Sequence, residues 1–270
     1  MELRYWIADP SGNTTALVKE GFPAELRRKT AALLMETGEV EQVGFLSAPR
    51  SGEAKGRLEM AGGEFCGNAT LSVAVWKAEN LMLISPNRKE LKIECTGAEA
   101  ALCCAAWNIG GVEYGAVEMP LPSRIYERTF SAGGRTGIFS VVEAPGITHL
   151  LWPVDDFGDA ERNFALSGIK GWCAELGAEA LGVILCSRDF GRIAPLVFVP
   201  ESDTLVWENG CGSGTAALGA FLAKEGGSLE KEVRQPGGTI RVRAECRKGI
   251  LSLLQISEAV SFSEEKILQI

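Results

Sequence analysis

Short apolar runs separated by turn residues predict a series of strands in the first half of the chain. Residues 3–9 (LRYWIAD) and 14–19 (TTALVK) are expected to pair as strands across the turn PSGN. Residues 23–38 (PAELRRKTAALLMETG) have helical spacing, with Pro23 suited to the first turn and Gly38 to the end of the helix. Further strands are expected at residues 41–49, 56–61 and 90–96.

The second half of the chain repeats this order of elements. Strands are expected at 137–144 and 148–154, a helix at 161–177, and further strands at 180–187, 193–200 and 239–245. Because the repeat period is near half the chain, two similar domains fit the pattern better than a solenoid. Residues 117–125 (VEMPLPSRI) contain two prolines and are the natural crossover between the two halves.

The composition is that of an ordinary globular protein. The chain has 270 residues, of which 46% are hydrophobic and 23% charged, enough for one large domain or two of roughly 130 residues. A net charge of −8 argues against nucleic-acid binding and against docking on anionic membranes. The first ten residues contain no apolar signal-peptide core, and no apolar run reaches the roughly 20 residues that span a bilayer. We therefore expect a cytoplasmic protein.

The cysteine spacing does not predict a metal site or a disulfide framework. The cysteines lie at positions 66, 95, 103, 104, 173, 186, 211 and 246. No CxxC occurs, and His149 is the only histidine, so no bound metal is expected. A lone histidine in an apolar strand is more often structural, and His149 is left outside the candidate catalytic residues. Most of the cysteines are expected to be small buried hydrophobic residues.

Two of these cysteines begin matching motifs, one in each half of the chain. Residues 66–70 are CGNAT and residues 211–215 are CGSGT, and both run into small and apolar residues. The helices expected at 66–78 and 215–227 have no consistently polar face, so each should be buried on nearly all sides. Taken singly, each motif could be a buried cysteine before a helix capped by Asn, Ser or Thr. Their repetition in matched halves favours a functional site.

The start of a buried helix suits anion binding and thiol chemistry. Its first N–H groups lack partners within the helix, and the helix dipole favours negative charge. A cysteine there is expected to have a lowered pKa and to form a thiolate. Two such helix starts facing each other would hold one carboxylate and place a sulfur on each side of its α-carbon. That arrangement suits racemisation by two bases, with the developing enolate held by N–H donors.

The paired motif resembles the cofactor-independent, two-cysteine amino-acid racemases and epimerases of the diaminopimelate epimerase fold. The resemblance rests on Asn13 in PSGN, on the CGN and CGSG motifs, on Glu208 in WEN, and on QPGG at 235–238. It implies an α+β fold with two pseudo-symmetric lobes, each a curved sheet wrapped around a buried central helix. We expect an N-terminal lobe at 1–118, joined by residues 257–270, and a C-terminal lobe at 119–256.

Within this family, the longer strings look like those of the histidine racemases that supply D-histidine for opine-type metallophores. The strings are DPSGNTTALV, EQVGF, EFCGNAT, LVWENGCGSGTA and RQPGGTI. The resemblance implies Cys66 and Cys211 as the exchanging base and acid, no cofactor and a small amino-acid substrate, and by analogy a homodimer. It implies that the amides after the cysteines bind the α-carboxylate, and that polar side chains line the site. The substrate-binding candidates are Gly67, Asn68, Gly212 and Ser213 for the carboxylate, and Asn13, Glu41 and Glu208 for the α-amino group or side chain.

Departures from diaminopimelate epimerase argue against diaminopimelate as the substrate. Asn209 replaces the Arg that follows the Glu, Ile147-Thr148 replaces Asn-Pro, and Leu181-Gly182 replaces Thr-Asn. These losses would leave the far charged end of that substrate unpaired, which is costly. The alternatives are a racemase of another amino acid, an isomerase related to phenazine-biosynthesis proteins, and a non-catalytic amino-acid binder. Glu41 and Glu208 could also be merely solvated charges.

Overall fold

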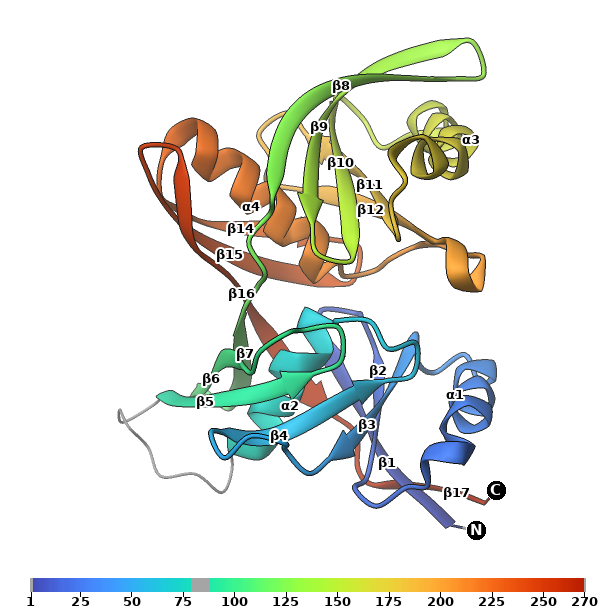
Figure 1. The fold of residues 1–270 in the computed structure, drawn as a ribbon, viewed down its shortest axis with the longest axis vertical. Coiled ribbons are helices and arrows are strands. Elements are labelled where there is room, and N and C mark those ends of the chain that lie inside the picture. The colour runs from blue at the N-terminus through green and yellow to red at the C-terminus, as the bar shows by residue number, and fades with distance from the viewer. Residues whose placement is uncertain (1, 79–87, 270) are drawn as a thin grey trace. The chain divides into compact units, whose positions relative to one another are not determined.

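The structure, a computed structural model, describes residues 2–78 and 88–269. These residues form two compact units (Figure 1). Unit 1 runs to Glu118 and takes in the C-terminal segment from Ser257 onward, and unit 2 is Met119–Ile256. Strand β16 (Ile250–Phe262) contributes residues to both units.

Unit 1 is a sheet built around one helix. Its elements are β1 (Glu2–Pro10), β2 (Thr15–Val18), η1 (Ala24–Leu26), α1 (Arg27–Glu36), β3 (Gln42–Ser47), β4 (Ala54–Met60), α2 (Gly67–Ala78), β5 (Arg88–Cys95), β6 (Leu102–Ile109), β7 (Val112–Glu118), the end of β16 and β17 (Lys266–Gln269). The strand order is β7-β6-β5-β4-β3-β2-β1-β17, and β16 neighbours both β7 and β1. The sheet thus curves back toward its own first strands.

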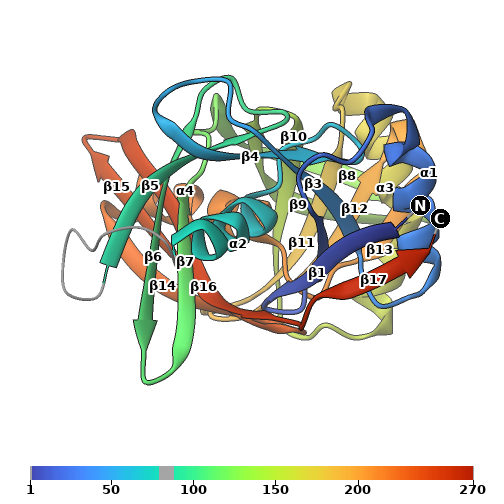
Figure 2. The same cartoon turned by 90° about the horizontal axis from the view of Figure 1, so that it is seen from below.

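Helix α2 lies inside this curved sheet and contacts β1, β4, β5, β6 and β7 (Figure 2). Its residues 67–75 are all buried, as the absence of a polar face predicts. Close approach of sheet and helix needs a small residue at Gly115, where an added Cβ would lie 2.8 Å from the Leu71 carbonyl oxygen. The buried helix thereby fixes where its N-terminus, and the cysteine before it, can lie.

Unit 2 also surrounds a helix with strands. Its elements are β8 (Arg124–Ala132), β9 (Arg135–Ala144), β10 (Ile147–Val154), α3 (Asp159–Leu176), β11 (Leu181–Ser187), β12 (Ile193–Val199), η2 (Pro200–Ser202), β13 (Thr204–Trp207), α4 (Gly212–Gly226), β14 (Leu229–Gln235), β15 (Gly238–Arg247) and the start of β16. One sheet has the order β13-β12-β11-β10-β9-β8, and β14, β15 and β16 follow one another as neighbours. Helix α4 contacts β14 and β15 on one side and β9 and β10 on the other.

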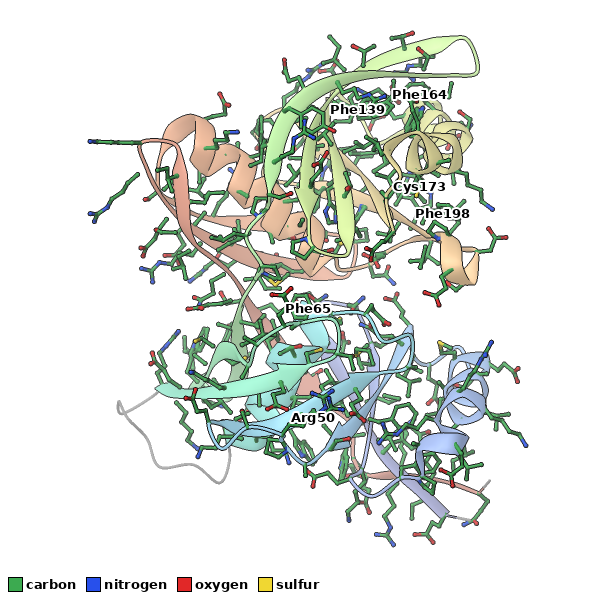
Figure 3. The ribbon with its side chains drawn as sticks, in the orientation of Figure 1. Arg50, Phe65, Phe139, Phe164, Cys173 and Phe198 are labelled. Atoms are coloured by element: carbon green, nitrogen blue, oxygen red, sulfur yellow. The ribbon has the colours of Figure 1, made fainter. Side chains whose placement is uncertain are left out.

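Helix α3 covers the opposite part of unit 2 and closes its aromatic core. Phe139 and Phe164 lie with Phe198 and Cys173 in a single buried cluster between this helix and the β8–β13 sheet (Figure 3). The Phe139 ring of β9 lies 5.3 Å from the Trp172 ring of α3, so aromatic contacts tie strands to helix. This core lies away from the start of α4 and supports the sheet that carries β10 and β11.

The predicted α+β class is confirmed, and the expected strands and helices in both halves are present. Pro23 does not lie in the first turn of α1, because its backbone is extended and a short 3-10 turn separates it from the helix. Gly38 follows α1 at φ +71°, a left-handed conformation that suits the end of a helix. The strand expected around Glu208 is present as β13, which ends at Trp207, just before that residue. The sequence did not predict β6, β7, β8, β14, β16 or β17. Of the helices described, none has the length and apolar character needed to span a membrane.

Candidate active site

Cys66 immediately precedes α2, and its sulfur caps the helix. The Ala69 N–H donates to Cys66 Sγ at 3.4 Å. The Cys66 carbonyl oxygen accepts from the Thr70 hydroxyl at 2.7 Å and from the Thr70 N–H at 3.0 Å. Phe65, just before the cysteine, lies at the N-terminal end of α2 (Figure 3). Its backbone packs against Gly97, where an added Cβ would lie 2.3 Å from the Phe65 nitrogen.

Cys211 takes the same position before α4. The Gly214 N–H donates to Cys211 Sγ at 3.3 Å, and the Thr215 hydroxyl donates to the Cys211 carbonyl at 2.8 Å. The four-residue spacing from cysteine to threonine is therefore one capping unit used twice. Polar caps were expected from Asn, Ser and Thr, but at both helix starts the cysteine sulfur takes the capping position and the threonine hydroxyl donates to the cysteine carbonyl. The sulfur occupies that place because its N–H donor is three residues further on, the usual cap spacing.

A series of hydrogen-bonded side chains leads from the sulfur of Cys66 through two amides to a carboxylate. Gln42 Nε2 donates to Cys66 Sγ at 3.3 Å and also to Asn13 Oδ1. Asn13 Nδ2 in turn donates to Glu41 Oε2 at 3.2 Å. The structure thus brings together Asn13, Glu41 and Cys66, and it adds Gln42, which sequence reasoning missed. The available signal was a polar residue beside Glu41 at the start of an otherwise apolar strand.

Different side chains hold Cys211. Its N–H donates to Gln235 Oε1 at 2.7 Å, and Gln235 Nε2 donates to the Thr215 hydroxyl at 2.7 Å. Gln235 is buried, so both bonds are shielded from water. It belongs to the string RQPGGTI but was not singled out. Glu208 lies beside the thiol and hydrogen-bonds with it, and Ser213 Oγ lies 3.5 Å from Cys211 Sγ.

The expected low thiol pKa values are wrong for both cysteines. Burial raises the pKa of Cys66 to about 12, although the Ala69 N–H and the Gln42 amide act in the other direction. Burial also raises the pKa of Cys211 well above its ordinary value, and the negative charge of Glu208 raises it further. The free-energy cost of removing a thiolate from water is larger than the stabilisation that the few N–H and O–H donors facing it provide.

The remaining candidates lie at the two helix starts. Gly67, Asn68 and Gly212 are buried, Ser213 and Glu208 are half-buried, and Glu41 is exposed. Glu41 comes just before β3 rather than within a strand, and its N–H donates to the Thr14 carbonyl at 3.0 Å. Within the described ranges, no group of three or more His, Cys, Asp or Glu side chains could hold a metal ion.

Comparisons with known proteins agree on one family. A family model described as "Histidine racemase CntK N-terminal domain" matches residues 2–267. The chain is 30% identical over 239 residues to the histidine racemase of Staphylococcus aureus, and the matched region covers 87% of this chain and 85% of that protein. It is 27% identical over 233 residues to a histidine racemase of Fusobacterium nucleatum subsp. nucleatum, covering 85% of both.

Among solved structures, a probable proline racemase from Agrobacterium radiobacter K84 has a TM-score of 0.70 to this chain. The match has 13% sequence identity and covers 97% of this chain and 92% of the other. At that identity the likeness concerns the fold alone.

Proposed function

This chain belongs to the histidine racemase family, and from that premise we propose that it interconverts L- and D-histidine by proton transfer between Cys66 and Cys211. It is an isomerase, an amino-acid racemase. The reaction needs the two thiols and no cofactor.

One observation carries the mechanism: the same sulfur-capped helix start occurs in both units. In each, the N–H three residues after the cysteine donates to its sulfur. The N–H groups of Gly67, Asn68, Gly212 and Ser213 precede these donors in the first turn, where a carboxylate is held well. An α-carboxylate bound there would place its α-carbon beside a sulfur. The mechanism requires both sulfurs to reach one α-carbon, from opposite faces.

The raised thiol pKa values suit this chemistry. An α-proton is weakly acidic, so a thiolate that binds its proton tightly is the stronger base toward it. One cysteine acts as thiolate and removes the proton, and the other delivers a proton to the opposite face. Charge that develops on the carboxylate side is stabilised by N–H groups already oriented at the helix start. For the opposite enantiomer the two cysteines exchange roles.

The substrate's own charges complete the electrostatics of the site. A histidine zwitterion brings an α-ammonium group, for which Glu208 beside Cys211 and Glu41 beside Asn13 are suitable partners. A cation near the sulfur would also favour the thiolate, since opposite charges within a few ångströms lower a thiol pKa. Substrate binding would then help to offset the cost that burial imposes on the thiolate.

Solvent-deuterium incorporation at the α-carbon tests the proposal. Enzyme and L-histidine in D2O should give deuterated D- and L-histidine, and chelators should not change the rate. Cys66→Ser and Cys211→Ser should each reduce racemisation by several orders of magnitude. Cys103→Ser is the matched control, because Cys103 is an exposed thiol. Full exchange surviving both substitutions would overturn the two-thiol mechanism, and exchange with other amino acids but not histidine would overturn the substrate.

Two further expectations belong to this proposal. We infer a cytoplasmic location, which the thiol inventory supports: all eight cysteines lie in the described ranges and each is free. The family resemblance supports a homodimer. Light scattering on the purified protein would then give twice the chain mass of 28.9 kDa, and a monomeric mass would overturn that expectation.

A further inference from the structure

His149, the only histidine in the sequence, is buried beside the second cysteine motif. It lies in β10 with 1% of its surface exposed. Its Nε2 lies 3.1 Å from Ser213 Oγ, and that oxygen lies 3.5 Å from Cys211 Sγ. Within unit 2, the three side chains therefore form a continuous hydrogen-bonded series that ends at the sulfur.

The neighbouring strand leaves space for this imidazole. Gly182 of β11 is paired directly with His149. A Cβ at Gly182 would lie 2.6 Å from His149 Cδ2 and 3.2 Å from its Nε2. Glycine in a strand interior usually weakens it, so its use here marks a close approach. Any larger residue would push the ring away from Ser213.

The surroundings of the ring fix the direction of the hydrogen bonds. His149 Nδ1 is buried and has no hydrogen-bond partner among the residues that the structure describes. A buried N–H without an acceptor is rare and costly, so the proton belongs on Nε2. Burial lowers the pKa of His149 to about 4, so the ring is neutral near pH 7. Nε2–H then donates to Ser213 Oγ, and the Ser213 hydroxyl is left to donate to Cys211 Sγ.

We propose that His149 is a positioning residue for Cys211: it holds the Ser213 hydroxyl with its proton toward the sulfur and so stabilises the thiolate. The inference rests on the proposed function, because it assigns a role to a thiolate at that position. Successive hydrogen bonds polarise one another, so the hydroxyl becomes a better donor when Nε2–H bonds its oxygen. The hydroxyl and the Gly214 N–H both act against the rise in the Cys211 pKa.

The other unit contains a counterpart built from different residues. There the side-chain donor to sulfur is the Gln42 amide, and Asn13 holds that amide in place. Among the described residues, each sulfur thus accepts from a backbone N–H and from a side-chain donor, and that side-chain donor bonds a further buried side chain. His149 corresponds in this role to Asn13, which is also buried.

Because the protein has a single histidine, nitrogen-15 labelling of histidine gives one imidazole spectrum. We expect the neutral tautomer with the proton on Nε2, no titration between about pH 5.5 and pH 8, and a changed Nε2 shift in Ser213→Ala. A proton on Nδ1, or titration near the ordinary pKa of about 6.5, would overturn the proposal. This measurement needs no substitution at His149 and no substrate.

Alkylation of Cys211 by iodoacetamide, followed by peptide mass spectrometry, tests the effect on the thiolate. His149→Gln keeps an N–H near the place of Nε2, whereas the shorter His149→Asn removes it. In the same way, Ser213→Thr keeps the hydroxyl and Ser213→Ala removes it. We expect the Asn and Ala variants to slow Cys211 alkylation about tenfold, equivalent to one pKa unit. The Gln and Thr variants should stay near the parent, and alkylation of Cys66 should not change.

The double variant distinguishes a relay from independent roles. If His149 acts through Ser213, His149→Asn adds nothing in the Ser213→Ala background. Additive losses, a Gln variant as slow as the Asn variant, or an equal loss at Cys66 would each overturn the proposal. If circular dichroism shows that His149→Asn does not fold, the comparison of Ser213→Thr with Ser213→Ala and the imidazole spectrum still test the proposal. Absence of α-proton exchange would refute the proposed function while leaving these measurements valid.

Discussion

Gln42 Nε2 donates a hydrogen bond to Cys66 Sγ over 3.3 Å, so a neutral amide directly supports one of the two proposed catalytic sulfurs. The same nitrogen donates to Asn13 Oδ1, which fixes the amide's orientation. A donor held in this way stabilises a thiolate without the cost of reorienting when charge forms.

Replacing that donor should therefore impair catalysis more than folding. Gln42→Met keeps the length of the side chain and removes the N–H. A hydrogen bond to a charged group contributes roughly 1.5–3 kcal/mol, so kcat/KM should fall about tenfold to a hundredfold. The exposed Lys55→Met is a control of similar chemistry on the same sheet. Unchanged kcat/KM in Gln42→Met would show that the amide does not support the thiolate.

The raised thiol pKa values predict slow, steeply pH-dependent alkylation. Below its pKa of about 12, the thiolate fraction of Cys66 rises tenfold with each pH unit. The rate at Cys66 should thus climb without a plateau from about pH 7 to pH 10. In urea-unfolded protein, the same peptide should level off above about pH 8.5. A plateau below pH 9 in the folded enzyme would contradict the effect of burial.

Glu258 predicts a pH dependence of stability. This glutamate of β16 is 2% exposed, and burial raises its pKa to about 8, with the Asp9 charge adding to the shift and Ser11 opposing it. Between its ordinary pKa of 4.5 and about 8, the folded state keeps a proton that the unfolded state has lost. Stability from this group is thus complete below the ordinary value and falls as pH rises, by about 1.4 kcal/mol per unit.

Glu258→Gln should remove that loss, so its stability relative to the parent should increase steadily over this range in urea unfolding. His149 has the opposite slope in the parent, because its folded pKa of about 4 lies below the ordinary 6.5. Comparing the variant with the parent cancels that contribution. Glu127→Gln, at an exposed position, is the control. A difference that stays constant with pH would show that Glu258 is ionised in the folded protein.

Gly97 and Gly63 form a matched pair for testing how the backbone before Cys66 is held. Both have positive φ, +74° and +81°, so alanine strains each of them. An added Cβ meets nothing within 4 Å at Gly63, but lies 2.3 Å from the Phe65 nitrogen at Gly97. Gly63→Ala should cost about 1 kcal/mol of stability with near-normal activity. Gly97→Ala should lose much more activity than Gly63→Ala. Equal activity in the two variants would refute the role of the contact between Gly97 and the Phe65 backbone.

The sequence predicted the order of elements and the paired cysteine motifs, because local spacing and turn residues carry that information. The burial of α2 and α4 followed from the lack of a polar face: Ser72 is the one polar residue between Leu71 and Val75, and none lies between Ala216 and Ala220. Strands β6 and β7 were not identified, although they directly cover α2.

The side-chain partners could not be predicted, because they depend on register and packing. His149 reaches Ser213 only because β10 and β11 pair with Gly182 opposite the ring. Gln42 reaches Cys66 only because β3 takes its place in the sheet that encloses α2. The thiol pKa was mispredicted for the same reason. The N–H groups of the helix start lower the pKa of Cys66, but burial by the surrounding sheet raises it by a larger amount.

The two sulfurs have unlike partners, an amide at Cys66 and a hydroxyl with a carboxylate at Cys211. Enantiomers have equal free energies in water, so the equilibrium constant of racemisation is one whatever the enzyme's asymmetry. A substitution beside either sulfur must then change kcat/KM for L- and D-substrate by the same factor. The separate values of kcat and KM can still differ between L- and D-substrate, and only they can show which sulfur was affected. An enzyme built from two dissimilar halves is still bound to treat the mirror images with equal efficiency.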